Sequence, residues 1–280
     1  MRGRRFAPQA GDTCHLSPPR LPPKMRGMKT SDASLSFGID APTLVRGFAL
    51  GGPLLLMLGL AAAGRSGLAG VFAPSLQGTG FGMIGSAILM SLSSMYGKRI
   101  VARRLIASLA LRGDERVLDV GCGRGLLLLE AARALPRGHA SGIDLWSVRD
   151  QSGNASAATH ANAVAAGVAE RVGIDTGDMR ALPYADASFD VVVSSLAIHN
   201  LPSAAERAKA IGEIVRVVKP GGRIALLDFV QTGRYADTLR ECGCTHVRRS
   251  WPNLLMFPPV RIVRAEQSLA VRSDCVGASV

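Results

Sequence analysis

Residues 116–125 read Arg-Val-Leu-Asp-Val-Gly-Cys-Gly-Arg-Gly, a short apolar run that ends in three alternate glycines. The aliphatic residues are typical of a buried strand. Gly121, Gly123 and Gly125 lack a Cβ, so the backbone of the turn after the strand can approach a ligand closely. The apolar stretch 126–135, which a proline stops, predicts a helix that begins at the same turn. A strand, a glycine turn and a helix in this order indicate a nucleotide-like site in an α/β fold.

Strand and helix patterns alternate along the rest of the chain after residue 97. This alternation predicts a parallel sheet with helices on both faces. Ligands in such sheets bind beyond the carboxyl ends of the strands. The predicted strands are 116–120, 140–145, 172–176, 189–196 and 223–229, and the predicted helices are 98–111, 126–135, 154–168 and 203–218.

The residue after the glycine turn bears on the kind of nucleotide. A dinucleotide fingerprint requires Gly or Ala where this sequence has Leu126. A nucleoside without phosphates therefore suits the turn better than a pyrophosphate. Asp144 ends the second predicted strand, where a carboxylate can accept hydrogen bonds from both ribose hydroxyls. A nicotinamide-dependent Rossmann oxidoreductase is kept as an alternative.

Four stretches in the same order resemble the class I S-adenosylmethionine-dependent methyltransferases, in a small-molecule type similar to the ubiquinone/menaquinone-biosynthesis enzymes. They are residues 117–125, 177–184, 188–195 and 216–223. The resemblance covers about residues 97–264. It implies a Rossmann-like seven-stranded methyltransferase sheet with helices on both faces and S-adenosyl-L-methionine as cofactor. The last strand of that sheet is antiparallel and could come from residues 254–264.

The resemblance also implies roles for single residues. The first strand end and the glycine turn should line the methionine part of the cofactor, and the second strand end should bind ribose and adenine. The third strand end should bind the adenine amino group, and the fourth should border the reactive end. The stretch 146–154 is longer and more polar than usual in the family, so it could reshape the adenine side or join the substrate site. The cofactor-binding residues implied are Asp119, Gly121, Cys122, Gly123, Gly125, Asp144, Leu145, Trp146, Asp178, Met179, Ser194 and Ser195.

His199 and Asn200 follow the fourth predicted strand and are the candidate catalytic residues. A base is needed only if the methyl acceptor must lose a proton, and imidazole titrates near working pH. Asn200 could orient an acceptor. Alternatively, both residues cap the next helix or form hydrogen bonds within a loop.

Residues 44–96 are predicted to form a two-helix transmembrane hairpin. Apart from Arg46 and Arg65 the segment carries no charge, and each arm is about 20 residues long, enough to cross roughly 30 Å of hydrocarbon. The alternative is an apolar hairpin packed on the domain or on a partner subunit. Glycines spaced four apart, which suits close helix packing in lipid, are Gly47 and Gly51 on one arm and Gly78 and Gly82 on the other.

Basic residues flank both ends of the hairpin, whereas the loop between its arms carries Arg65 alone. The positive-inside rule then predicts a membrane location with the catalytic domain, residues 97–280, on the cytoplasmic side. Residues 1–43 are predicted to be a disordered basic tail because their first 30 residues are rich in proline and show no apolar periodicity. Whether residues 1–27 belong to the mature protein is open, since Met25 and Met28 are both plausible starts.

Composition excludes several protein classes. Of 280 residues, 48% are hydrophobic, which excludes a wholly disordered chain. The net charge of +12 contains no basic run interleaved with aromatics, so no nucleic-acid partner is predicted. Five cysteines argue against a disulfide scaffold. No metal site is predicted either, since Cys242, Cys244 and His246 lack a fourth ligand.

The sequence thus predicts a membrane-anchored S-adenosylmethionine-dependent methyltransferase with a small, lipophilic acceptor. The anchor motivates the acceptor class, because a domain held at a bilayer meets lipophilic molecules at high local concentration. A non-enzymatic cofactor-binding membrane scaffold is a further alternative. The sequence leaves open whether C, N, O or S is methylated, and also the oligomeric state.

Overall fold

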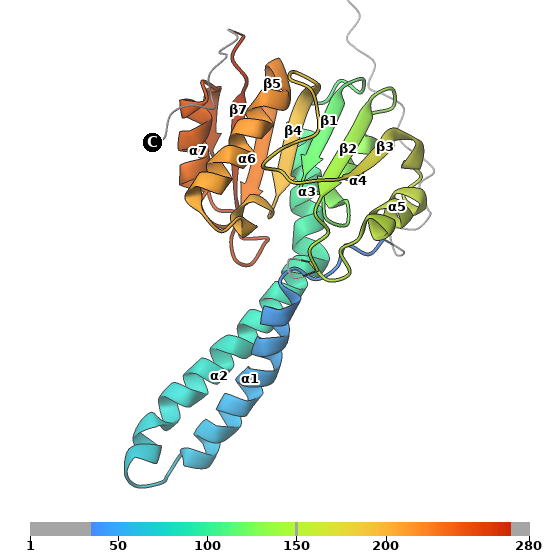
Figure 1. Ribbon diagram of the computed structural model, residues 1–280. Coiled ribbons are helices and arrows are strands. Elements are labelled where there is room, and N and C mark those ends of the chain that lie inside the picture. Colours follow the sequence, from blue (N-terminus) through green and yellow to red (C-terminus); the bar gives the residue numbers. More distant parts are fainter. Residues whose placement is uncertain (1–34, 149–150, 270–280) are drawn as a thin grey trace, which may run out of the picture. The chain divides into compact units, whose positions relative to one another are not determined.

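The computed structural model describes residues 35–148 and 151–269, so the predicted tail lies outside the described residues as far as residue 34. Two long helices come first, and a seven-stranded sheet with its covering helices follows (Figure 1). Short helical turns lie at Ser93–Gly97, Ala169–Arg171 and Ile198–Asn200. The α-helices are α1 (Pro42–Ala62), α2 (Leu68–Leu92), α3 (Lys98–Ser108), α4 (Leu126–Arg133), α5 (Ser156–Ala165), α6 (Ala204–Val217) and α7 (Thr232–Glu241). The strands are β1 (Arg116–Val120), β2 (His139–Asp144), β3 (Val172–Thr176), β4 (Phe189–Ser195), β5 (Val218–Asp228), β6 (Thr245–Arg249) and β7 (Arg261–Glu266).

The sheet has the order β3-β2-β1-β4-β5-β7-β6, and β7 runs antiparallel to both of its neighbours. The predicted Rossmann-like seven-stranded sheet with an antiparallel last strand is confirmed. Dinucleotide-binding sheets follow the order 3-2-1-4-5-6 without this insertion, which weighs against the oxidoreductase alternative. Residues 254–260, predicted to begin the last strand, form a loop instead. Pro258 and Pro259 have no N–H to donate to a ladder, so the strand begins at Arg261.

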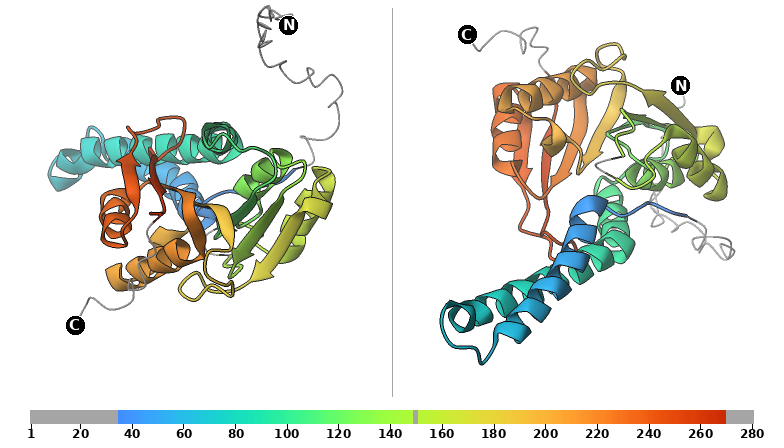
Figure 2. Two further views of the ribbon diagram at one scale, coloured as in Figure 1. Left: turned by 90° about the horizontal axis from the view of Figure 1, so that it is seen from above. Right: turned by 60° about the horizontal axis from the view of Figure 1, so that its bottom comes forward.

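Helices cover both faces of the sheet (Figure 2). Successive side chains of β1 pack against helices on opposite faces. Val117 packs in one buried cluster with side chains of α3 and α4. Leu118 and Val120 pack in a second cluster with side chains of α6 and α7. Because β1 lies between β2 and β4, its carboxyl end is the point where the strand order reverses. The fold therefore brings the ends of β1, β2 and β4 to one edge, where such sheets bind ligands.

Helices α1 and α2 form an antiparallel hairpin whose close contact depends on glycine. A Cβ at Gly80 would lie 2.7 Å from the backbone nitrogen of Leu56 and 2.8 Å from the carbonyl oxygen of Gly52. Gly59 lies equally close to Gln77, which donates a hydrogen bond from Nε2 to the Gly59 carbonyl (3.1 Å). The contact on α1 thus repeats after seven residues, which is two helical turns.

The glycine spacing predicted for this contact was wrong in most of its positions. No described atom lies within 4 Å of a Cβ built at Gly47, Gly78 or Gly82. Gly51 does face the other arm, at the Met83 side chain. A spacing of four residues places small side chains on one face, but it does not say which face meets the partner helix.

The outer surface of the hairpin is apolar. Leu50, Leu68 and Val71 are 76%, 76% and 69% exposed. Among the described residues, one helix is long and apolar enough to cross a membrane, namely α1, with a mean hydropathy of 1.7. Glycines, serines and Gln77 lower the hydropathy of α2, although it carries no charge. The predicted transmembrane hairpin is therefore not confirmed, because only one of its two arms meets this criterion of length and composition.

Residues 35–41 do not belong to a disordered tail, which corrects the predicted boundary at residue 43. Leu35 and Phe37 are buried, and the Arg99 guanidinium lies 5.2 Å from the centre of the Phe37 ring. The Ser36 backbone N–H donates a hydrogen bond to the Asn162 side-chain oxygen of α5, and the Ser36 carbonyl accepts one from the Asn162 side-chain nitrogen. The segment stays ordered because its apolar side chains and its backbone polar groups both find partners on the sheet domain. Helix α1 then begins at Pro42, two residues before the predicted boundary.

Candidate active site

The glycine turn after β1 has a backbone that other residues cannot adopt easily. Gly121, Gly123 and Gly125 all have positive φ angles, of 71°, 50° and 85°. A Cβ at Gly121 would clash with the Cβ of Ala197, and one at Gly123 would lie 2.6 Å from the Gln151 side chain. The turn is therefore packed from both sides, and it presents backbone instead of side chains to the space beyond the sheet.

Asp144 at the end of β2 is oriented toward this turn. Its Oδ2 accepts a hydrogen bond from the Gly123 backbone N–H at 2.8 Å. Its Oδ1 accepts from the Trp146 backbone N–H at 2.6 Å and from the Asn154 side chain at 3.2 Å. These three hydrogen bonds hold the carboxylate at the carboxyl end of β2, where the resemblance implies a contact with the ribose.

Asp119 is the one buried carboxylate beneath the turn that keeps an oxygen free among the described residues. Its Oδ2 accepts a hydrogen bond from the Leu128 backbone N–H at 2.9 Å, and its Oδ1 has no partner in the part of the chain that the structure describes. Burial raises the pKa of Asp119 to about 7, and the nearby charge of Asp144 adds to the rise. A buried oxygen without a partner at a cavity is a site for a ligand donor, such as an ammonium group.

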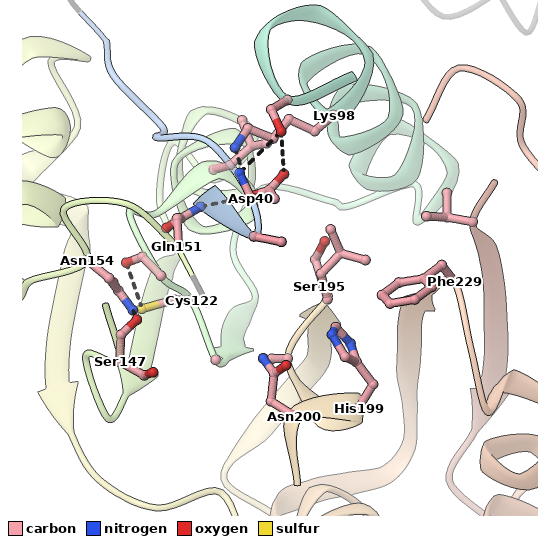
Figure 3. Close-up of a pocket in the computed structure, with 18 of the residues that line it drawn as sticks. Asp40, Lys98, Cys122, Ser147, Gln151, Asn154, Ser195, His199, Asn200 and Phe229 are labelled. Atoms are coloured by element: carbon pink, nitrogen blue, oxygen red, sulfur yellow. Dashed lines mark hydrogen bonds and ion pairs between the residues drawn. The ribbon is translucent and has the colours of Figure 1, made fainter. Parts of the chain in front are cut away.

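A cavity of about 690 Å³ lies beyond the carboxyl ends of the strands and is of the size of a cofactor site (Figure 3). Most of the predicted site residues line it together, although they come from four separate segments of the sequence. Those that line it are Asp119, Gly121, Cys122, Gly123, Asp144, Leu145, Met179, Ser195, His199 and Asn200.

The other four predicted residues do not line the cavity. Gly125 directly precedes α4, and Ser194 is buried and donates a hydrogen bond from its hydroxyl to the Val120 carbonyl at 2.7 Å. Trp146 turns its indole N–H to the Thr176 hydroxyl at 2.7 Å. Asp178 accepts hydrogen bonds from Nε of Arg180 at 3.0 and 2.9 Å. These bonds lower the pKa of Asp178, and its carboxylate is engaged outside the cavity wall.

His199 lies on the cavity wall and forms a buried pair with Asp228. Its Nδ1 lies 3.0 and 3.1 Å from the two carboxylate oxygens of Asp228, and its ring stacks edge-on against Phe229. Asp228 also accepts a hydrogen bond from the Tyr235 hydroxyl at 3.1 Å. Burial, and then the charge of Asp228, raise the pKa of Tyr235, so this hydroxyl stays a donor. With a proton on Nδ1 toward Asp228, Nε2 is the ring nitrogen left to accept a proton.

Three polar residues of the cavity wall were not among the predicted site residues. Lys98 donates from Nζ to the Phe37 carbonyl, the Gly38 carbonyl and Asp40, at 2.9, 2.8 and 3.1 Å. Burial lowers the pKa of Lys98, and the charge of Asp40 opposes this change. Gln151 lies in the polar stretch already singled out, and it accepts a hydrogen bond from the Arg124 backbone N–H at 2.8 Å. Figure 3 shows Asp40 and Lys98 on one side of the cavity and His199 on the other.

The part of the cavity wall that comes from the hairpin base and the loop before β7, called the apolar end below, carries large apolar side chains beside Ser86, Ser93 and Ser94. They include Leu44 and Phe48 of α1, Met90 of α2, and Met256 and Phe257 of the loop before β7. The base of the hairpin is therefore part of the cavity wall. Among the described residues, no group of three His, Cys, Asp or Glu side chains is placed to hold a metal ion.

Residues 118–226 match the family model described as a methyltransferase domain. The match thus covers the part of the chain that runs from β1 into β5. The family and the fold imply S-adenosyl-L-methionine as methyl donor, so the predictions of an S-adenosylmethionine-dependent methyltransferase domain and of its cofactor are confirmed.

Curated relatives agree with this family over half of their length. The chain is 37% identical over 146 residues to 27-O-demethylrifamycin SV methyltransferase of Amycolatopsis mediterranei, which covers 50% of each chain. It is 33% identical over 144 residues to the ubiquinone/menaquinone biosynthesis C-methyltransferase UbiE of Roseobacter denitrificans, which covers 51% of this chain and 54% of that one. The chain thus spans about half the length of the curated relatives it matches.

Solved structures agree in fold. A SAM-dependent methyltransferase from Aquifex aeolicus superposes with a TM-score of 0.50 at 16% identity, over 65% of this chain and 98% of that chain. At this identity the likeness shows the fold alone.

Proposed function

We propose that this protein is a membrane-anchored S-adenosylmethionine-dependent methyltransferase that methylates a small lipophilic acceptor. One observation carries the proposal. One cavity is lined both by the glycine turn and Asp144, its polar end, and by Phe48 and Met90 of the hairpin, which belong to its apolar end. A polar cofactor and an apolar acceptor would thus meet between the sheet and the hairpin.

The polar end fits the cofactor in two respects. Asp119 Oδ1, which has no partner among the described residues, suits the ammonium group of the methionine part. The turn at Gly121 and Gly123 leaves no room for a Cβ and so brings backbone to the ligand. Asp144 would hold the ribose, and Leu145 and Met179 would border the adenine. When bound, S-adenosyl-L-methionine supplies an electrophilic methyl group.

Two of the predicted cofactor contacts would each require a side chain to give up a hydrogen bond. Asp178 can reach the adenine amino group only if its bonds to Arg180 rearrange. Trp146 can cover the adenine only if its indole leaves the Thr176 hydroxyl. Ser195 lines the cavity and needs no such rearrangement to border the reactive end.

At the acceptor side, His199 would act as the general base. Nε2 would take the proton from a hydroxyl or an acidic carbon of the acceptor, and Asp228 would stabilise the imidazolium formed through its contact with Nδ1. One relative is named for an O-demethylated compound and the other for C-methylation, and methyl transfer to a hydroxyl or to a carbon can require loss of a proton. Asn200, also on the wall, would orient the acceptor.

The membrane part of the proposal rests on the hairpin. α1 is long and apolar enough to span a bilayer, and the side chains of Leu50 and Leu68 are each 76% exposed. Basic residues before α1 and after α2 favour an orientation in which the sheet domain faces the cytoplasm. The UbiE-type relatives also suggest a quinone-like acceptor, which would reside in the bilayer.

A truncation at the closest contact of the hairpin tests the proposal. Gly52 and Gly80 lie so close together that a short Gly-Ser linker can replace residues 53–79. This variant keeps every hairpin residue that lines the cavity. We expect it to lose co-flotation with lipid vesicles while its affinity for S-adenosylhomocysteine stays unchanged. Equal flotation of the truncated and full chains would refute the anchor.

The scaffold alternative differs from the enzyme in one observable. A cofactor-binding scaffold would bind S-adenosylhomocysteine but would release none from S-adenosylmethionine when cellular lipid extract is supplied as acceptor pool. Release that depends on His199 would establish transfer, because a scaffold has no use for a base.

A further inference from the structure

The loop at residues 250–258, between β6 and β7, exposes large apolar side chains to an unusual degree. Trp251 is 88% exposed and Leu254 is 80% exposed. Soluble surfaces rarely gather such residues without a partner. The same stretch of chain is basic, because residues 242–265 contain four arginines and no acidic residue.

The loop is fastened to the base of the hairpin. The Phe257 backbone N–H donates to the Ser93 hydroxyl at 3.0 Å. A Cβ at Gly97 would clash with the Leu255 carbonyl, so the loop backbone presses against the turn that follows α2. Figure 2 shows the loop reaching the end of α2. The position of the loop is therefore fixed relative to the hairpin.

Apolar exposure continues onto the hairpin where the loop meets it. Leu92, Met95 and Tyr96 lie on the turns next to Ser93 and Gly97, and they are 48%, 51% and 61% exposed. On the inner side of the same loop, Met256 and Phe257 line the apolar end of the cavity. The loop thus has one side on the cavity and one side facing outward.

We propose that the loop 250–258 is a second membrane contact, which holds the apolar end of the cavity on the surface of a bilayer that contains anionic lipid. This inference rests on the proposed membrane anchoring by the hairpin. A bilayer is the fitting partner because the exposed apolar side chains continue onto the hairpin. An indole ring also prefers the membrane–water interface, and Arg248 and Arg249 at the adjoining strand end attract anionic headgroups.

This contact gives the acceptor a route. A lipophilic molecule in the outer part of the bilayer would reach the apolar end of the cavity beside Phe257 without crossing water. The cofactor would enter at the polar end, beside Asp144. The two substrates would therefore come from different phases.

The test uses the full chain in vesicles of phosphatidylcholine and phosphatidylglycerol. The chain has two tryptophans, so the emission of Trp251 is the difference between the wild type and Trp251→Phe. We expect lipids brominated near the headgroup to quench this emission, and we expect quenching by aqueous acrylamide to fall several-fold relative to the protein in detergent.

A matched pair of variants sharpens the test. Leu254 and Leu269 are both 80% exposed, but Leu269 packs beside Gly221 at the opposite, amino-terminal edge of β5. Leu254→Asp should restore access of acrylamide to Trp251 several-fold, whereas Leu269→Asp should leave it unchanged.

Two results would overturn the inference while the protein still floats with vesicles. One is full quenching of Trp251 by acrylamide without quenching by brominated lipid. The other is protection of Trp251 from both quenchers that increases with the number of chains per vesicle. This result would indicate that a second copy of the chain covers the loop. A protein that does not float at all would refute the anchoring proposal itself, and this inference with it.

Discussion

The hairpin and the sheet domain place their apolar side chains in opposite ways. In the domain, Leu118 and Val120 of the central strand are fully buried between two helical layers. In the hairpin, Leu50 and Val71 point outward and are mostly exposed, while glycines fill the inside. The domain thus keeps its apolar side chains away from water, whereas the hairpin exposes its own, and this difference is why we propose a bilayer around the hairpin. The cavity lies where the two meet, and it has one polar and one apolar end.

The largest expected effect concerns the chemistry at that meeting point. His199→Gln should lower the rate of methyl transfer by about 10²- to 10⁴-fold, because the variant keeps the size but loses the base. S-adenosylhomocysteine release with lipid extract as acceptor pool measures the rate. Calorimetry should show unchanged binding of S-adenosylhomocysteine, and an unchanged transfer rate would remove His199 from the mechanism.

The next effect tests the polar end alone. Asp144→Ala removes a carboxylate whose charged hydrogen bonds to a ribose are worth about 1.5–3 kcal/mol each, so cofactor affinity should fall by about tenfold or more. Asp178→Ala serves as the matched control, because Asp178 pairs with Arg180 outside the cavity. Calorimetric titration with S-adenosylhomocysteine compares the two. Equal losses would show that Asp178 turns into the site when the cofactor binds.

The hairpin can be disturbed separately from the domain. Gly80→Leu should force α1 and α2 apart and cost about 1–3 kcal/mol of helix packing, since its Cβ would meet the Leu56 backbone. Gly78→Leu is the control, because no described atom lies within 4 Å of its Cβ. Protease susceptibility of the hairpin in detergent reports the difference. If both variants were cleaved equally fast, the glycine contact would not hold the helices together.

The smallest effect is a pH dependence at Asp119. Burial raises the pKa of Asp119 to about 7. The protonated carboxyl therefore stabilises the ligand-free fold fully below the ordinary pKa near 4, and this stabilisation is lost as the pH rises to about 7. Binding of an ammonium group should favour the ionised form, so affinity for S-adenosylhomocysteine should rise over the same range.

Asp119→Asn supplies the control for that pH dependence. The amide keeps the shape of the side chain but cannot ionise, so both the melting temperature and the affinity should become flatter between about pH 5 and 8. Thermal unfolding and calorimetry at several pH values measure the two slopes. A wild-type slope that survives in the variant would assign the titration to another group.

The parts of the site that lie within one local pattern could be predicted from the sequence. The glycine turn and Asp144 follow directly from strand ends and their spacing, and the structure places both on the cavity. Asp178 also ends a predicted strand, but Arg180, two residues further on, draws its carboxylate away. A strand-end rule places the backbone and says nothing about competing side-chain partners.

The parts that depend on distant segments could not be predicted. Lys98 and Asp40 are 58 residues apart in the sequence, and the intervening hairpin brings them together. No periodicity marks residues 35–41, whose order comes from contacts with α3 and α5. The pairing of His199 with Asp228 likewise needs β4 and β5 to be neighbours, which sheet topology decides.

We propose, above all, that this chain methylates a molecule held in a bilayer. Its most direct test is to incubate the full chain, in vesicles of cellular lipid extract, with S-adenosylmethionine that carries a tritiated methyl group. We predict tritium in the organic-soluble lipid fraction, and none above background with Asp144→Ala or His199→Gln. Tritium found only in water-soluble acceptors, or equal lipid labelling by the variants, would contradict this proposal.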